Sequence, residues 1–361
     1  MRCLVTFLPL FSLLAACSSQ PKPVAEPVVP VNNSAPQSGF VLTPQHAIHP
    51  LSGDFADNPA TARFIDKMVR EHGFDRQQLH DVLAQTRQLD WVVTLMDKQA
   101  PVGQPSTRPN GAWIRYRSKF ITPDNIQKGV MFWNQHEEAL KRAEQVYGVS
   151  PEIIVGIIGV ETGWGRVMGK TRIIDALATL SFNYPRRAEY FSGELETFLL
   201  MARAEGDDPL SLQGSYAGAM GYGQFMPSSF KSYAVDFNGD GHINLWDPVD
   251  AIGSVANYFK SHGWTHGATV AVPASGQATG LDFGFKTNYS VATLAAAGLT
   301  PRGSLEGNQQ ASLLRLDMGN RYEYWYGLPN FYTITRYNHS VHYAMAVWQL
   351  GEAVGRARRG H

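Results

Sequence analysis

A carboxylate at the end of an apolar helix is the residue of this chain best suited to acid–base chemistry. Residues 150–165 have the sequence SPEIIVGIIGVETGWG, in which Ser150 and Pro151 predict a helix start and Gly163 predicts its end. Glu161 follows three isoleucines by seven, four and three residues, so it shares their apolar face. Burial and the negative end of the helix dipole both raise the pKa of a carboxyl group there. Glu161 is a candidate general acid, the alternative being an acid that only ends a core helix.

A glycine-rich segment about fifty residues later combines small residues with aromatic rings. Residues 215–229 have the sequence SYAGAMGYGQFMPSS, whose three glycines allow a ligand to approach the backbone closely. Aromatic faces and a neutral amide, that of Gln224, suit a sugar chain, because its C–H faces stack on rings while its hydroxyls form hydrogen bonds. The pattern is not that of a phosphate-binding loop, and the nearest lysine is Lys231. The alternative is a tight connection between two core helices.

Residues 236–247 (DFNGDGHINLWD) have the layout of an EF-hand calcium loop, with the turn glycine Gly241 at position six. Position seven offers a backbone carbonyl, and position twelve holds an aspartate that is one methylene shorter than the usual glutamate. The ligands predicted at positions one, three, five, seven and twelve are Asp236, Asn238, Asp240, His242 and Asp247. We expect a structural calcium ion, replaceable by another cation, and no organic cofactor. A solvated turn rich in Asp and Asn is the alternative.

The composition excludes several classes of protein. The 361 residues contain 31 Lys and Arg against 31 Asp and Glu, so no overall field attracts nucleic acid. The two cysteines, Cys3 and Cys17, exclude a disulfide framework and a metal site built on cysteine. A chain of this length buries a large core and divides into two or three substructures.

The first residues have the pattern of an export signal. Arg2 precedes an apolar run to Ala16 that is too short to span a bilayer. The sequence LAAC at residues 14–17 resembles the lipobox of bacterial lipoproteins, which implies acylation of Cys17, and Ser18 implies sorting to the outer membrane. More than one acyl chain suffices for stable anchoring. We therefore expect a lipid-anchored protein on the periplasmic face of the outer membrane, the alternative being a plain secreted protein.

Apolar periodicity predicts a mainly α protein (α+β). Helical patterns return near residue 58, Asp75 can cap a second helix, and a third helix is predicted from Thr122 to about Tyr147. Short runs broken by Gly, Pro and Asn between about residues 267 and 321 predict a small β-containing insertion. The predicted parts are a signal peptide (1–16), an acylated cysteine and tether (17–47), a helical domain (48–148), a catalytic core with the EF-hand-like loop (149–265), a small β-containing domain (266–329) and a return to the core (330–361) that ends in a helix over Ser340–Arg359.

Two motifs together, Glu161-Thr-Gly-Trp-Gly and the glycine-rich segment 215–229, resemble the membrane-bound lytic transglycosylase B family of murein-cleaving enzymes. The resemblance covers the chain from about residue 48 to 358. It implies a lysozyme-like helical core with an additional helical domain and a small β domain, and it implies that Glu161 is the single acid and base. Positions that match residues of the family in contact with the acid or the sugar chain are Tyr116, Ser215, Gln224, Tyr258, Tyr337, Asn338 and Tyr343.

The resemblance also implies a reaction. Glu161 would protonate the oxygen between N-acetylmuramic acid and N-acetylglucosamine in peptidoglycan, with help from the muramoyl N-acetyl group, and would then deprotonate the 6-hydroxyl, which closes on C1 as a 1,6-anhydro sugar. Most glycosidases use two carboxylates, but neither the glycine-rich segment nor residues 337–343 contain one. A muramidase hydrolase on the same scaffold and a non-enzymatic calcium-binding lipoprotein that grips murein remain alternatives. The implied partners are glycan strands and the outer membrane, with complexes with other cell-wall enzymes left open.

Overall fold

The structure is a computed structural model that describes residues 49–99 and 108–360. The predicted signal peptide, the acylation site Cys17 and the predicted tether lie outside the described residues. Helices form most of the described part, with one five-stranded and one two-stranded sheet, so the prediction of a mainly α protein is confirmed.

The described residues form fourteen α-helices, one short 3-10 helix and seven strands. The helices are α1 (Pro59–His72), α2 (Arg76–Ala84), α3 (Asp90–Gln99), α4 (Ala112–Arg117), α5 (Pro123–Gln135), α6 (Glu137–Tyr147), α7 (Pro151–Thr162), α8 (Ile173–Asn183), η1 (Pro185–Arg187), α9 (Ala188–Glu205), α10 (Pro227–Tyr233), α11 (Pro248–Ser261), α12 (Val291–Ala296), α13 (Pro329–Tyr337) and α14 (Val341–Arg358). The strands are β1 (Thr171–Arg172), β2 (Gln213–Gly214), β3 (Ala271–Gly276), β4 (Tyr289–Ser290), β5 (Leu299–Pro301), β6 (Gln310–Asp317) and β7 (Tyr322–Gly327).

Helix α7 lies at the centre of the helical core, and eleven of its twelve residues are buried. Its main neighbour is α14, which comes from the other end of the chain. A Cβ atom at Gly156 would lie 2.3 Å from the backbone oxygen of Val347, and one at Gly351 would lie 2.0 Å from that of Glu152. The two helices can therefore approach each other this closely only because both positions are glycine.

The region before the acid is helical, as predicted, and Asp75 caps α2 by accepting a hydrogen bond from the backbone N–H of Gln78. The single helix predicted from Thr122 to Tyr147 is wrong in one respect, because the chain leaves the helical conformation at His136 and forms α5 and α6. Both helices contact α7, but α5 packs mainly against α14, whereas α6 packs mainly against α11. The bend at His136 lets each half reach its own partners.

The predicted β-containing insertion is confirmed as an antiparallel sheet with strand order β4-β6-β7-β3-β5. The sheet has its own small apolar core, with Leu294 of α12, Leu313 of β6 and Tyr326 of β7 at its centre. Strand β7 lies within the predicted β-containing domain (266–329), and α13 follows it without having been predicted. Helix α13 leads the chain back to the core, where Ser340 caps α14 through the backbone N–H of Tyr343.

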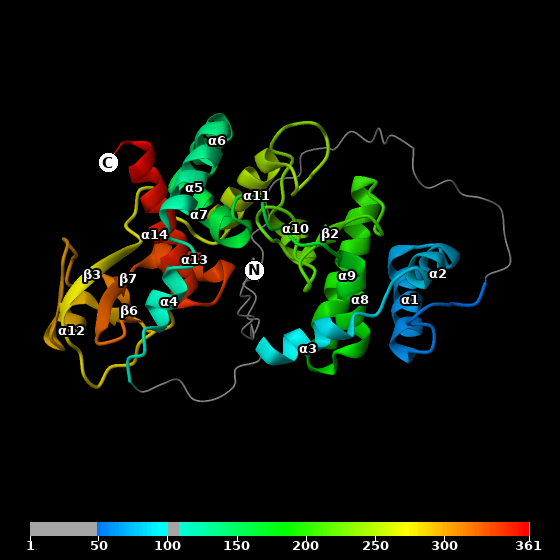
Figure 1. The fold of residues 1–361 in the computed structure, drawn as a ribbon, viewed down its shortest axis with the longest axis horizontal. Coiled ribbons are helices and arrows are strands. Elements are labelled where there is room, and N and C mark those ends of the chain that lie inside the picture. Colours follow the sequence, from blue (N-terminus) through cyan, green and yellow to red (C-terminus); the bar gives the residue numbers. More distant parts are fainter. Residues whose placement is uncertain (1–48, 100–107, 361) are drawn as a thin grey trace, which may run out of the picture.

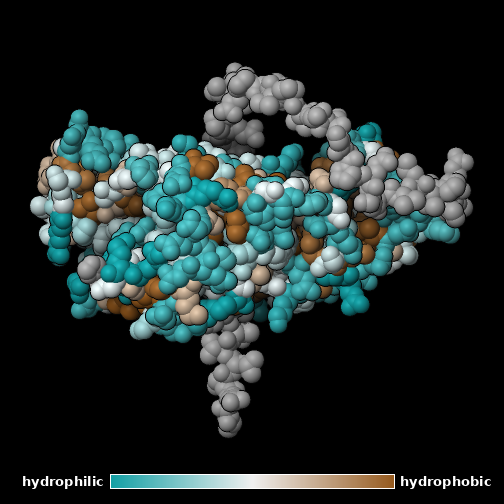
Figure 2. All heavy atoms as spheres, turned by 90° about the horizontal axis from the view of Figure 1, so that it is seen from above, coloured by the Kyte–Doolittle hydropathy of each residue, from teal (hydrophilic) through white to brown (hydrophobic). Residues whose placement is uncertain are grey.

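The molecule is elongated, with the small sheet and α12 at one end, α1 and α2 at the other, and α5, α6, α7, α11 and α14 between them (Figure 1). The face seen in Figure 2 is largely hydrophilic, with scattered apolar patches. Within residues 49–99 and 108–360, no helix has both the length and the apolar character that crossing a membrane requires.

Candidate active site

The site is built around Glu161, which lies in the last turn of α7. The helix begins after Ser150 with Pro151 at its first position and ends at Gly163, whose φ of +57° is left-handed, as the sequence predicts. Glu161 is 8% exposed and lies among the apolar residues of α7. Burial raises the pKa of its carboxyl group to about 7. The group therefore keeps its proton close to neutral pH, which is what a general acid requires.

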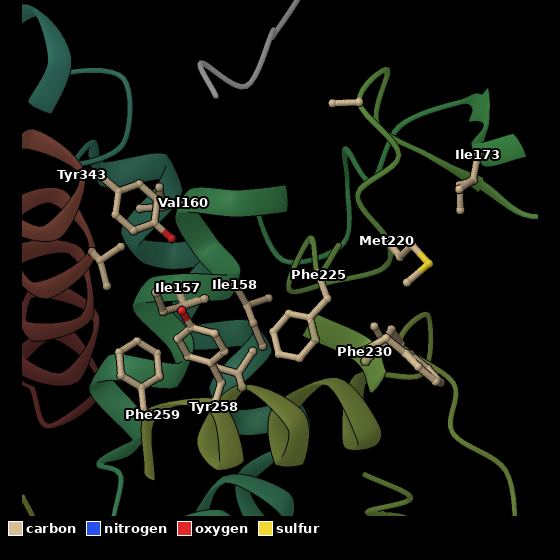
Figure 3. Close-up of a cluster of buried hydrophobic side chains, with 14 of the residues drawn as sticks. Ile157, Ile158, Val160, Ile173, Met220, Phe225, Phe230, Tyr258, Phe259 and Tyr343 are labelled. Atoms are coloured by element: carbon tan, nitrogen blue, oxygen red, sulfur yellow. The ribbon is translucent and has the colours of Figure 1, made fainter. Parts of the chain in front are cut away.

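Tyr343 of α14 donates a hydrogen bond from its hydroxyl to Oε1 of Glu161 at 2.5 Å. This bond lowers the pKa of Glu161, but its effect is smaller than that of burial. Figure 3 shows the Tyr343 ring reaching from α14 toward α7, near the apolar side chains Ile157 and Val160. The close glycine contact between α7 and α14 brings the two polar groups together across 182 residues of sequence.

Two further tyrosines face Glu161 from other elements. The charge of Glu161, added to the effect of burial, raises the pKa of Tyr116 on α4 and of Tyr337 on α13, as it does for Tyr343. Tyr116 packs its ring against Phe120, Trp113 and His342. Three of the predicted site tyrosines therefore surround the carboxyl group from α4, α13 and α14, and each is a neutral hydrogen-bonding group near pH 7.

The glycine-rich segment folds into a tight loop that holds its own polar side chains. The Oγ atom of Ser215 accepts the backbone N–H groups of Ala217 and Ala219, at 3.3 and 2.9 Å. Gln224 has a φ of +53° and donates its amide to the backbone oxygen of Gly221 at 2.9 Å. A left-handed backbone at a residue other than glycine is strained, and such strain occurs often at functional sites. Ser215 and Gln224 shape the loop beside Glu161, and no hydrogen bond in the described residues joins either of them to the carboxyl group.

The hydroxyl groups of the other predicted tyrosines bind the backbone. Tyr337 donates to the carbonyl of Gly223 at 2.6 Å, which ties α13 to the glycine-rich loop, and Tyr258 donates to the carbonyl of Arg336 at 2.7 Å. Asn338 follows Tyr337, and its buried Oδ1 atom has no hydrogen-bond partner. A buried acceptor without a partner is costly. Asn338 is therefore the predicted site residue whose side-chain acceptor the described residues leave unpaired.

The other buried carboxylates of the described residues are engaged elsewhere. Asp175 pairs with Arg172, and Glu194 accepts hydrogen bonds from the backbone and the hydroxyl of Ser228. Asp250 accepts three backbone N–H groups of the loop 236–247. None of them acts on the pKa of Glu161. The site thus offers one buried acid rather than a pair.

The EF-hand-like loop forms its turn around Asp236. The carboxylate of Asp236 accepts the backbone N–H groups of Gly239, Asp240 and Gly241, and these bonds lower its pKa. The Asn238 amide lies 3.1 Å from a carboxylate oxygen of Asp240. Asp236, Asn238 and Asp240 therefore share one turn, as the spacing predicts. His242 follows them, with its side chain exposed.

The structure places Asp247 differently from the prediction for position twelve. Its carboxylate caps α11 by accepting the backbone N–H groups of Val249 and Asp250. Asp250, one turn further on and fully buried, is the carboxylate that reaches back to the loop, through the backbone N–H groups of Phe237 and Asn238 at 2.8 and 2.9 Å. In the described residues no three His, Cys, Asp or Glu side chains converge as a metal site. The loop is preformed by hydrogen bonds to its own backbone.

Known proteins resemble this chain in both sequence and fold. Residues 56–352 match the family model of the transglycosylase SLT domain. The membrane-bound lytic murein transglycosylase B of Escherichia coli (strain K12) is 72% identical over 356 residues, which cover 98% of either chain. The solved structure of the Escherichia coli lytic transglycosylase Slt35 in complex with calcium is 73% identical, with a TM-score of 0.84, and covers 88% of this chain and 100% of its own.

A second solved structure of Escherichia coli Slt35, in complex with bulgecin A, is 74% identical with the same coverage and a TM-score of 0.84. The matched regions include α7 with its carboxylate, the glycine-rich loop and the first part of α14. The expected lysozyme-like helical fold is therefore confirmed, and this chain belongs to the transglycosylase SLT family, among the lytic murein transglycosylases of type B.

Proposed function

We propose that this lytic transglycosylase cleaves the β-1,4 bond between N-acetylmuramic acid and N-acetylglucosamine in peptidoglycan, with Glu161 as its single acid and base. The observation that carries the proposal is a buried carboxyl group with a pKa of about 7, facing three tyrosines and no second carboxylate of the described residues. The name of the Escherichia coli relative, a murein transglycosylase, supports the choice of substrate.

The first step uses the proton of Glu161. Because Tyr343 donates to Oε1, the proton that Glu161 gives away resides on Oε2. This proton passes to the bridging oxygen, which leaves C1 as the 4-hydroxyl of N-acetylglucosamine while the carbonyl oxygen of the muramoyl N-acetyl group bonds to C1. The Glu161 carboxylate then takes the proton of the muramoyl 6-hydroxyl, whose oxygen bonds to C1 as the N-acetyl oxygen leaves it. The enzyme returns to its starting protonation state, and no water is consumed.

The products distinguish this reaction from that of a muramidase hydrolase. A transglycosylase leaves a 1,6-anhydro end, which is lighter by one water than the reducing end that a hydrolase leaves. Mass spectrometry of digested sacculi should therefore give anhydro ends. Reducing muramoyl ends as the main product would identify a hydrolase, and a folded protein without any product would identify a murein-binding lipoprotein.

We further propose that Cys17 anchors the protein at the periplasmic face of the outer membrane, on the basis of the lipobox-like sequence and the membrane-bound name of the relative. A Cys17→Ser variant cannot be acylated through a thioether, so we expect it to leave the membrane fraction. Its specific activity in solution should equal that of the wild-type protein, because the predicted anchor and the site are separate in sequence. Fractionation followed by sacculus digestion tests both statements, and a variant that stays in the membrane fraction would contradict the anchor.

We also propose that the loop 236–247 binds a structural calcium ion through Asp236, Asn238 and Asp240, with the buried Asp250 supporting the loop from α11. The spacing of the loop and the calcium complex of Escherichia coli Slt35 support this proposal. The ion is placed outside the reaction because none of these residues acts on the pKa of Glu161.

Calcium should therefore raise the melting temperature. An ion that binds the folded state alone stabilises it by about 2.7 kcal/mol at a hundredfold excess over its dissociation constant. Magnesium should have a smaller effect, because it demands octahedral geometry and keeps its water. Asp236→Ala should abolish the calcium response, measured by thermal unfolding, and should still cleave sacculi at low temperature. A folded but inactive Asp236→Ala protein would place the ion in the reaction.

A further inference from the structure

Trp164 has a backbone conformation that side chains rarely adopt. Its φ is +60°, and its neighbours Gly163 and Gly165 also have positive φ values, +57° and +85°. In residues 49–99 and 108–360, Gln224 is the one other non-glycine residue with a positive φ. A strained conformation of this kind persists only where surrounding contacts hold it in place. The contacts of Trp164 therefore indicate its role.

The indole ring of Trp164 lies in a slot that two glycines leave open. A Cβ atom at Gly159 of α7 would lie 2.6 Å from the indole Cζ2, and one at Gly129 of α5 would lie 2.8 Å from the same atom. The indole N–H donates to the backbone oxygen of Val155 at 3.1 Å, and Trp164 is 8% exposed. The ring thus packs between α5 and α7 and is bonded to α7 two turns before the helix ends.

The same residue closes the helix turn that carries Glu161. The backbone N–H of Trp164 donates to the carbonyl of Ile158 at 3.2 Å, and that of Gly163 donates to the carbonyl of Gly159 at 3.0 Å. Trp164, which follows Glu161 in the chain, therefore holds α7 at two carbonyl groups on the N-terminal side of Glu161, those of Val155 and Ile158. A shift of the indole ring would rotate the last turn of α7 and would move Glu161 with it.

We propose that Trp164 is a positioning residue that locks the last turn of α7 against α5 and so holds the carboxyl group of Glu161 at the hydroxyl of Tyr343. Nothing in the local sequence requires a tryptophan here, because a glycine after Gly163 would adopt the same backbone without strain. The ring and its N–H are what a glycine lacks. The proposal rests on the role of Glu161 proposed above.

The pH profile of the reaction reports this positioning. The titratable groups that face Glu161 are Tyr116 on α4, Tyr337 on α13 and Tyr343 on α14, and the pKa of each is raised, so all three stay neutral near pH 7. The loss of activity on the alkaline side then follows the deprotonation of Glu161. If its turn loosens, water reaches the carboxyl group and its pKa falls toward the ordinary value. The alkaline limb of the pH–rate profile, where activity falls as the pH rises, then moves to lower pH.

The test compares Trp164→Phe with Trp264→Phe, using soluble glycan strands as substrate. Trp264 is also 8% exposed, and its indole N–H has no partner in the described residues, so it controls for the loss of a buried indole. We expect Trp164→Phe to lower kcat about tenfold or more with little change in KM, since small misplacement of a catalytic group is costly. Its alkaline limb should move down by about half a pH unit or more. Trp264→Phe should lower the melting temperature and leave the limb in place.

A Trp164→Phe protein that loses only stability, while its kcat and the alkaline limb of its pH–rate profile stay unchanged, would overturn the proposal. If this variant does not fold, Gly159→Ala, whose methyl group would press on the indole ring, replaces it, and Gly193→Ala on α9, with no atom within 4 Å of its Cβ position, is its control. The limb should shift in Gly159→Ala alone, and an unshifted limb would again overturn the proposal. Failure of the proposed function is recognised separately, by wild-type products without anhydro ends or by an active Glu161→Gln protein.

Discussion

Replacement of Glu161 by glutamine should abolish cleavage of peptidoglycan while the protein stays folded. The amide has nearly the shape of the carboxyl group, and it can still accept the hydrogen bond from Tyr343. It cannot give a proton to the bridging oxygen or take one from the 6-hydroxyl. General acid–base catalysis contributes at least about a hundredfold to rate, so we expect a loss of that size or more. The decrease in turbidity of a suspension of sacculi measures it.

Glu152→Gln is the matched control, because it makes the same change in the first turn of the same helix. The carboxylate of Glu152 pairs with Arg359 at 3.0 Å, at the end of α7 remote from the site. This variant should keep its activity. Activity of Glu161→Gln above about one tenth of wild type would place the general acid elsewhere, since general acid–base catalysis typically contributes about a hundredfold or more.

The position of Glu161 could be predicted because its signals are local. A proline at the first helical position, a glycine after the last and an apolar repeat between them are enough to define α7 and to place the acid on a buried face. The hydrogen-bond partner of this acid could not be predicted from local signals. Tyr343 is 182 residues away, and no local pattern encodes a contact that depends on how closely α7 and α14 approach. The family resemblance pointed to Tyr343 as a site residue but not to this contact, and its role in binding or catalysis stays a prediction.

At the metal loop, the spacing of the sequence and the tertiary contacts point to different carboxylates, and the ligands stay a prediction. Counting along the EF-hand pattern selects Asp247 for position twelve, but Asp247 followed by Pro248 is also a helix start, and the structure uses it as the cap of α11. Once that helix begins, Asp250 lies one turn along it and reaches the loop. The Asp-Pro pair was the sequence signal from which the start of α11 could have been predicted. The bend at His136 had no such signal, because α5 and α6 separate to pack against different main neighbours, α14 and α11.

Glu161→Gln should also be more stable than the wild-type protein at alkaline pH. The pKa of Glu161 is about 7 in the folded state against 4.5 for an ordinary glutamate. Between these values the folded protein keeps a proton that the unfolded chain releases, so the wild-type protein loses stability as the pH rises through this window. One pKa unit corresponds to about 1.36 kcal/mol, so the buried acid lowers the free energy of unfolding by on the order of 3 kcal/mol above about pH 7.

The glutamine variant does not titrate, so the difference in unfolding free energy between variant and wild type isolates this one group. The other titrating residues are common to both proteins and cancel. Urea unfolding at about pH 4.5, 6 and 8 should show a difference that grows by on the order of 3 kcal/mol in favour of the variant, most of it present by about pH 7. This dependence on pH is expected for a buried acid that serves catalysis and lowers the stability of the folded protein. A difference that stays constant with pH would give Glu161 an ordinary pKa and remove the physical basis for its role as the general acid.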